Sequence, residues 1–135
     1  MLKRLSRGLT LFLLVTAGSA LGGFLRYAIA LLIHPRVGGA WPLGTLLVNV
    51  VGCFVLSLVN ESVSRGFSLR PELRLLLTTG FCGGFTTYST FNHETVKLVE
   101  EHGVLSGGGY AATTCVLCLL AHVAANILAR RLASV

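Results

Sequence analysis

Four long apolar stretches, separated by short polar connections, dominate the pattern of this chain. Each stretch meets the ~20 residues that a membrane-spanning helix needs, and together they cover approximately residues 9–33, 43–63, 73–98 and 105–128. The connections hold charged residues, Gly, Pro and Ser, and they are too short to contain a soluble domain. Residues 1–135 are therefore predicted to form one all-α membrane domain with four transmembrane helices.

The third stretch differs from the others in the segment Gly80-Phe81-Cys82-Gly83-Gly84-Phe85-Thr86-Thr87-Tyr88-Ser89-Thr90-Phe91. Three glycines within five residues weaken a helix, and four Ser or Thr hydroxyls follow within five positions. An opened backbone at membrane depth is tolerated only where it is buried in protein or lines a watery cavity. We therefore expect the third helix to be broken near its middle and to handle something polar there.

Composition supports an integral membrane protein. Hydrophobic residues make up 53% of the chain and charged residues only 12%, about half the charged fraction of a soluble domain. Small residues at positions 17–20 could end a cleavable signal peptide, but the apolar character continues to residue 33, which favours a retained first helix.

The net charge of +6 reports topology rather than nucleic-acid binding. With four crossings, eight of the eleven basic residues share one side: Lys3, Arg4, Arg7, Arg65, Arg70, Arg74, Arg130 and Arg131. Arg36 and Lys97 lie on the opposite side, and Arg26 lies within the first stretch. Cytoplasmic loops carry the excess of Lys and Arg, so both termini are predicted to be cytoplasmic.

Two polar residues inside apolar stretches have alternative interpretations. Arg26 either extends its guanidinium to the lipid headgroups or attracts anions at the mouth of an aqueous vestibule. Asn49 either bonds another helix as a structural contact or donates its amide N–H groups to a passing anion. The residues alone leave both alternatives open.

An enzyme is not expected. His93-Glu94 begins like a zinc-protease motif, but Lys97 stands where its second histidine would be, and no nucleophile–base pair is evident. Glu94 and Lys97, three residues apart, are expected to pair at a charged helix end. The glycines at 18, 22 and 23 are expected to serve helix packing, and the four cysteines to be small buried apolar residues.

Several motifs together resemble the Fluc (CrcB-like) fluoride channel family. They are Gly22-Gly23-Phe-Leu-Arg26-Tyr27, then Pro42-Leu-Gly44-Thr45-Leu-Leu-Val-Asn49-Val-Val-Gly52, then Gly80 to Phe91 with Glu94, and more weakly Tyr110-Ala-Ala-Thr-Thr114. The resemblance implies a passive channel in the bacterial inner membrane that exports cytoplasmic fluoride and relieves its toxicity. It also implies an antiparallel dimer with two pathways.

The resemblance assigns roles to particular residues. Backbone carbonyls of Gly83 and Thr86 would hold a structural Na⁺ ion at the dimer centre, and Arg26 would lie in a vestibule. The fluoride pathway would be lined by Asn49, Tyr88, Ser89, Thr90, Phe91, Tyr110 and Thr114. Hydroxyl and amide groups can replace the water of a small anion, and ring edges carry positive charge that can face it.

The chain departs from the family pattern in two ways, one at the pathway and one in its charge distribution. Tyr88 stands where the family has phenylalanine, and conduction is expected to persist. A chain that inserts in both orientations should carry similar numbers of basic residues on its two sides, whereas this one has eight against two. The partner is therefore either a second copy, as in a dual-topology dimer, or a homologue with the opposite fixed orientation.

Two other functions are alternatives to a fluoride channel. A four-helix, proton-coupled exporter of cationic compounds would need a membrane-embedded carboxylate, whereas Glu61, Glu72 and Glu94 all fall near helix ends. A non-conducting subunit of a heterodimeric channel is the second alternative.

Overall fold

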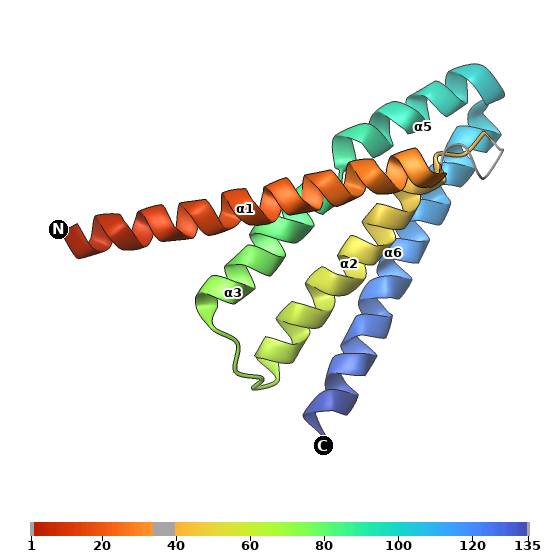
Figure 1. Cartoon of the computed structure of the whole chain (residues 1–135). Helices are drawn as coiled ribbons and strands as arrows, with labels where there is room; N and C mark the ends of the chain where they lie inside the picture. The colour runs from red at the N-terminus through yellow and green to blue at the C-terminus, as the bar shows by residue number, and fades with distance from the viewer. Residues whose placement is uncertain (1, 34–39, 135) are drawn as a thin grey trace.

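The computed structural model describes residues 2–33 and 40–134, with side chains from Leu5 onward. Every regular element in these ranges is a helix, which confirms the all-helical prediction. Three helices are long and apolar enough to cross a membrane: α1 (Leu2–Ile33, counted from Leu5), α2 (Leu43–Ser64) and α6 (Val104–Ala133). In Figure 1, α2 and α6 run side by side.

The third apolar stretch consists of several helical pieces rather than one continuous helix. In order they are α3 (Pro71–Leu75), the π-helix η1 (Leu76–Cys82), α4 (Gly83–Phe85) and α5 (Tyr88–His102). Proline suits the first position of α3 because the N–H that it lacks has no partner there. Between α4 and α5, Thr86 (φ −84°, ψ 159°) and Thr87 (φ −152°, ψ 116°) are extended.

Some helix ends differ from the apolar boundaries. The polar connection expected at 99–102 is helical, because α5 continues to His102 and only Gly103 separates it from α6. Gly103 has φ +84°, a conformation that glycine adopts without steric cost. Hydrophobicity indicates which residues suit the membrane interior, whereas the helix ends where the backbone can turn.

Glycines bring α1 into backbone contact with the third stretch. A Cβ atom at Gly18 would lie 2.6 Å from the Leu76 carbonyl oxygen, and one at Gly22 would collide with the Phe81 carbonyl oxygen. From the other side, a Cβ atom at Gly84 would collide with the Ser19 carbonyl oxygen. The packing role expected for Gly18 and Gly22 agrees with these contacts, and Gly84 shares it.

The α2–α3 connection and the α5–α6 turn lie at opposite ends of the molecule, and the N-terminal half of α1 extends away from the other helices (Figure 1). The α2–α3 connection, which carries Arg65 and Arg70, lies near the C-terminus, whereas the α5–α6 turn lies near the C-terminal end of α1 (Figure 1). Arg36, counted on the less basic side, lies outside the described residues.

Candidate functional site

Asn49 holds the break between α4 and α5 from the side of α2. Its Oδ1 accepts a hydrogen bond from the Thr87 amide at 2.9 Å, and its Nδ2 donates to the Thr87 carbonyl at 3.2 Å. Both backbone groups of this extended residue are thereby satisfied, as buried backbone polar groups need to be. Of the two interpretations of Asn49, the structure shows the contact with another helix, which leaves the second N–H of Nδ2 for other partners.

The bond from Asn49 also changes the end of α4. In a continuous α-helix the Thr87 amide would donate to the carbonyl four residues earlier, that of Gly83; here it donates to Asn49 instead. Thr86 still makes hydrogen bonds back to the preceding turn, since both its amide (3.0 Å) and its Oγ1 (2.9 Å) donate to the carbonyl of Cys82, the last residue of η1. The carbonyl of Gly83 is therefore free of its regular helical donor.

Gly52 provides the space that Thr86 occupies. A Cβ atom at position 52 would collide with Cγ2 of Thr86, and it would lie 3.5 Å from the Phe85 ring. Gly52 itself is buried. Only glycine at this position of α2 therefore lets the extended residue pack closely against it.

Hydroxyl groups gather at the start of α5. Thr87 Oγ1 accepts from the Thr90 amide at 3.3 Å and donates to Thr90 Oγ1 at 3.0 Å. Ser89 Oγ lies 3.4 Å from Thr87 Oγ1. This is the arrangement of an N-cap, in which a side-chain oxygen satisfies an amide of the first turn. The exposed amides of a helix N-terminus favour negative charge, so this end of α5 suits an anion.

Aromatic rings continue from the break toward α6. The ring centroids of Tyr88 and Phe91 are 5.9 Å apart, and those of Phe91 and Tyr110 are 5.6 Å apart. Trp41 meets Tyr110 edge to face at 5.9 Å. Tyr110 is completely buried, whereas Tyr88 is 79% exposed in the single chain. The ring at the break is thus the one open to a further partner.

Glu94 does not form the expected pair with Lys97. Its two carboxylate oxygens accept from Thr45 Oγ1 at 2.9 Å and from the Tyr110 hydroxyl at 3.2 Å, while Lys97 pairs with Glu101 at 3.7 Å. Spacing along α5 permits Lys97 to pair with either Glu94 or Glu101. The hydroxyls of Thr45 in α2 and Tyr110 in α6 already bond the Glu94 carboxylate, and Lys97 pairs with Glu101. A cavity of about 320 Å³ opens beside Glu94, with Trp41 also in its lining.

Arg26 binds the broken segment. Its Nε donates to the Gly84 carbonyl at 3.2 Å, at the C-terminal end of α4, where helical carbonyls lack amide partners. This contact was not among the two interpretations from the sequence, because nothing in the sequence showed that α4 ends beside α1. The vestibule position stays a prediction.

The structure brings together most of the predicted site residues. Gly83, Thr86, Tyr88, Ser89, Thr90 and Phe91 surround the break with Asn49, and Tyr110 joins them through Phe91. Thr114 is buried and its hydroxyl donates to the Tyr110 carbonyl of its own helix at 2.9 Å, so this hydrogen bond links it to the site only through Tyr110. Thr45, Gly52 and Thr87 stand in the motifs quoted above, but no role in the site was predicted for them; the hydroxyl before a helix start was a signal for Thr87.

The chain resembles known proteins over most of its length. Residues 13–126 match the profile of the family described as "CrcB-like protein, Camphor Resistance (CrcB)". Three of the relatives that carry the name "Fluoride-specific ion channel FluC" illustrate the similarity. The protein of Sorangium cellulosum is 45% identical over 115 residues, which are 85% of this chain and 91% of the relative. That of Rhizobium johnstonii is 44% identical over 121 residues, 90% and 97% of the two chains. That of Geobacter sulfurreducens is 40% identical over 124 residues, 92% and 100%.

The match confirms the resemblance seen in the sequence motifs. It covers α2, the whole broken segment and most of α1 and α6, so it includes Asn49 and every residue at the break. The chain belongs to the CrcB-like family.

Proposed function

We propose that this multi-pass membrane protein is a passive, fluoride-selective channel. The observation that carries the proposal is the name shared by relatives that are 40–45% identical over 85–92% of the chain, fluoride-specific ion channel. These relatives are named as channels, which agrees with the prediction that the chain is not an enzyme.

The groups at the break suit a small anion. Fluoride is strongly hydrated, and its transfer out of water needs close replacement donors. Such groups lie close together at the break. The donors are the hydroxyls of Ser89 and Thr90 and the second N–H of Asn49. The ring edges of Tyr88 and Phe91 add positive charge beside them. Several weak contacts, rather than one tight site, allow an ion to leave as well as bind.

We propose a dimer of oppositely oriented chains, each with four crossings, the third made of α3 to α5. In Figure 1 this broken segment extends from the α2–α3 connection to the α5–α6 turn, at opposite ends of the molecule. Tyr88 and Ser89 are exposed in the single chain, and an aromatic and a polar group at mid-segment are better covered by a second chain than by lipid. Arg26 would lie in a vestibule, and Tyr110 and Thr114 along the path.

A sodium ion would be held by the carbonyls of Gly83 and Thr86. The fit rests on the diverted Thr87 amide, which leaves the Gly83 oxygen without its helical donor, and on open space beside Gly83, where an added Cβ atom would meet nothing within 4 Å. Carbonyl oxygens suit hard cations. The ion would be structural and not transported.

Sodium replacement tests this site. Exchange of Na⁺ for N-methyl-D-glucamine at constant ionic strength is expected to lower the melting temperature of the purified protein and to shift it toward monomer in gel filtration. A titration with Na⁺ is expected to reverse both effects. Equal stability and size in the two cations would remove the sodium site from the proposal and leave the channel function untouched.

Reconstitution tests the function itself. The purified chain in liposomes, with valinomycin and a K⁺ gradient, is expected to release fluoride rapidly on a fluoride electrode and to release no chloride. Tyr88→Phe is expected to conduct like the unaltered chain. Release that requires a proton gradient, or uptake of an organic cation, would favour the exporter. Silence of the chain alone, with flux restored by a co-expressed homologue, would indicate the two-chain form.

The proposed location is the bacterial inner membrane, with both termini in the cytoplasm by the charge bias. Fluoride that accumulates inside would leave down its electrochemical gradient. An inside-negative potential supplies about 2.3 kcal/mol per charge per 100 mV for expulsion of an anion. A passive pore therefore relieves fluoride toxicity without coupling to another energy source.

A further inference from the structure

A polar residue or a cysteine occurs at every fourth position along α2. The series begins at Thr45 and continues through Asn49, Cys53, Ser57 and Glu61 to Arg65, which follows the helix end. Residues four apart lie on nearly the same side of a helix. The first two belong to the site described above, and the last three lead away from it toward the α2–α3 connection.

The facing helix α6 carries a matching series: Tyr110, Thr114, Cys118, His122, Asn126 and Arg130. The two series meet side chain to side chain. Cys53 and Cys118 are close enough to interact, and Ser57 Oγ lies 2.6 Å from His122 Nδ1. We call the paired residues from Ser57 and His122 to Arg65 and Arg130 the α2–α6 seam.

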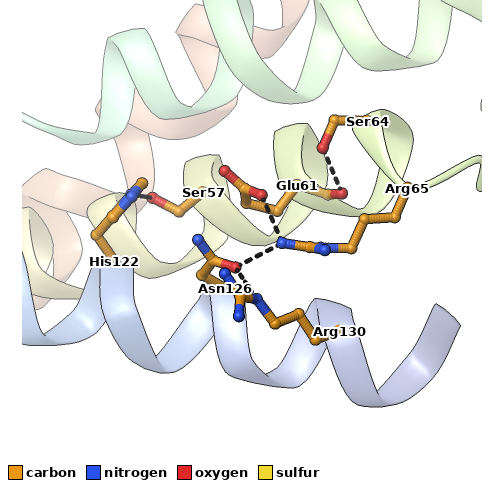
Figure 2. A network of polar contacts seen from close by, with 7 residues as sticks. All are labelled: Ser57, Glu61, Ser64, Arg65, His122, Asn126 and Arg130. Carbon is orange, nitrogen blue, oxygen red and sulfur yellow. Dashed lines mark hydrogen bonds and ion pairs between the residues drawn. The ribbon is translucent and has the colours of Figure 1, made fainter. Parts of the chain in front are cut away.

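Two arginines converge at the outer end of the seam. Arg65 Nη2 (2.8 Å) and Arg130 Nε (3.1 Å) both donate to the same oxygen, Asn126 Oδ1 (Figure 2). Glu61 lies 3.4 Å from Arg65 and offsets one of the two positive charges. The end of the seam therefore keeps a net positive charge, and several guanidinium N–H groups have no hydrogen-bond partner among the described residues and can bind an anion.

His122 lies well inside the apolar part of α6. It precedes Arg130 by eight residues, about 12 Å along a helix, and its neighbours Leu119, Leu120 and Val123 are 51–67% exposed, as expected of a lipid-facing surface. His122 is exposed in the single chain as well. A polar ring at this depth is costly against hydrocarbon, so water or protein must cover it, and its neighbours in the seam are polar.

We propose that the α2–α6 seam is an aqueous approach route for small anions, which enter at Arg65 and Arg130 and pass His122. The arginine pair concentrates anions at the mouth, since a positive cleft raises the local concentration of negative ions. The imidazole and hydroxyl groups replace part of the hydration shell further in. That the anion is fluoride rests on the proposed function, whereas the access of water does not.

Cysteine accessibility tests the route without any need for conduction. His122→Cys and Val123→Cys place a thiol at the same depth on two adjacent positions of the full-length chain in liposomes. A water-soluble sulfonatoethyl methanethiosulfonate reagent is applied, and peptide mass mapping separates these sites from the native cysteines. Modification is expected at position 122 at a rate about tenfold or more above that at 123. Equal rates, or no reaction at 122 in protein that elutes like the unaltered chain, would overturn the route.

Charge removal tests the mouth. In the His122→Cys chain, Arg65→Gln with Arg130→Gln is expected to slow the anionic reagent about fivefold or more and not to slow a trimethylammonium reagent. Arg70→Gln with Arg131→Gln removes the same charge elsewhere at this end and is expected to change neither rate. Equal effects of the two pairs would overturn the role of the arginines. Arg130→Gln alone gives the same comparison, against Arg131→Gln alone, if the double variant does not fold.

Fluoride efflux then assigns the ion. Modification at position 122 is expected to lower efflux about tenfold, and modification forced at 123 with a membrane-permeant reagent is expected to leave it unchanged. Unchanged efflux after complete modification at 122 would overturn the seam as a fluoride route. Absence of efflux from the unaltered chain, both alone and with a co-expressed homologue, would instead refute the proposed function, which keeps the two failures apart.

Discussion

Asn49→Ala is expected to slow fluoride efflux strongly and to lower the stability of the protein. The variant removes the only side chain of the described residues that hydrogen-bonds the Thr87 amide and carbonyl. Each buried polar group left without a partner costs about 1–3 kcal/mol. Because about 1.4 kcal/mol corresponds to a factor of ten, a displaced break is expected to reduce the rate of efflux roughly 100-fold.

The experiment compares Asn49→Ala with Asn60→Ala in the same helix. The Asn60 amide oxygen accepts from Arg74 at 2.8 and 3.2 Å in an exposed position, where such contacts contribute about 0–1 kcal/mol. Its loss is expected to leave efflux from liposomes within about twofold of the unaltered chain. Wild-type efflux from Asn49→Ala, measured at equal protein content, would contradict the role assigned to the amide.

Gly22→Ala and Gly23→Ala are expected to have opposite effects on stability, although they are neighbours in α1. A Cβ atom at position 22 would collide with the Phe81 carbonyl oxygen and lie 2.7 Å from the Phe85 amide nitrogen. Backbone atoms cannot move aside as a flexible side chain can, and overpacking of this kind costs about 1–3 kcal/mol or more. Gly22→Ala is therefore expected to separate α1 from the broken segment.

Gly23→Ala meets only the Gly84 carbonyl oxygen, at 3.9 Å, which is an ordinary contact. Replacement of a helical glycine by alanine favours the helix by about 0.8–1 kcal/mol. The melting temperature in detergent is expected to fall for the first variant and to stay equal or rise for the second. No fall for Gly22→Ala would show that α1 and the third stretch do not approach as closely as the structure has them, and an equal fall for both variants would show that position 23 is not the open position that the structure gives it.

The sequence indicates the break because its signal is local. Three glycines weaken a helix wherever they stand, and the hydroxyls after Thr86 supply a helix start. The partner of the break could not be read in the same way. Asn49 was equally compatible with a structural contact and with an anion site, since the choice depends on which backbone group faces it across 38 residues of chain.

The side chains around Glu94 show a second limit. Spacing on one helix suggested Lys97 as its partner, but Thr45 and Tyr110 come from two other helices and fit both carboxylate oxygens. The polar series on α2 and α6 was visible in the sequence, yet each member alone resembled an isolated membrane hydroxyl or an interfacial amide. Only the pairing of the two helices gives the series a meaning.

The broken segment is tied from two directions, by Asn49 at the break itself and by Arg26 and Ser19 of α1 at the carbonyls of Gly84 and Gly80 before it. Movement of either half-helix would have to release these bonds together. Such a scaffold has no second conformation of low energy in which the passage is closed. The passage that it frames would therefore stand open from the moment of assembly. Cells would then govern fluoride escape through the quantity of protein they make rather than through a switch in each molecule.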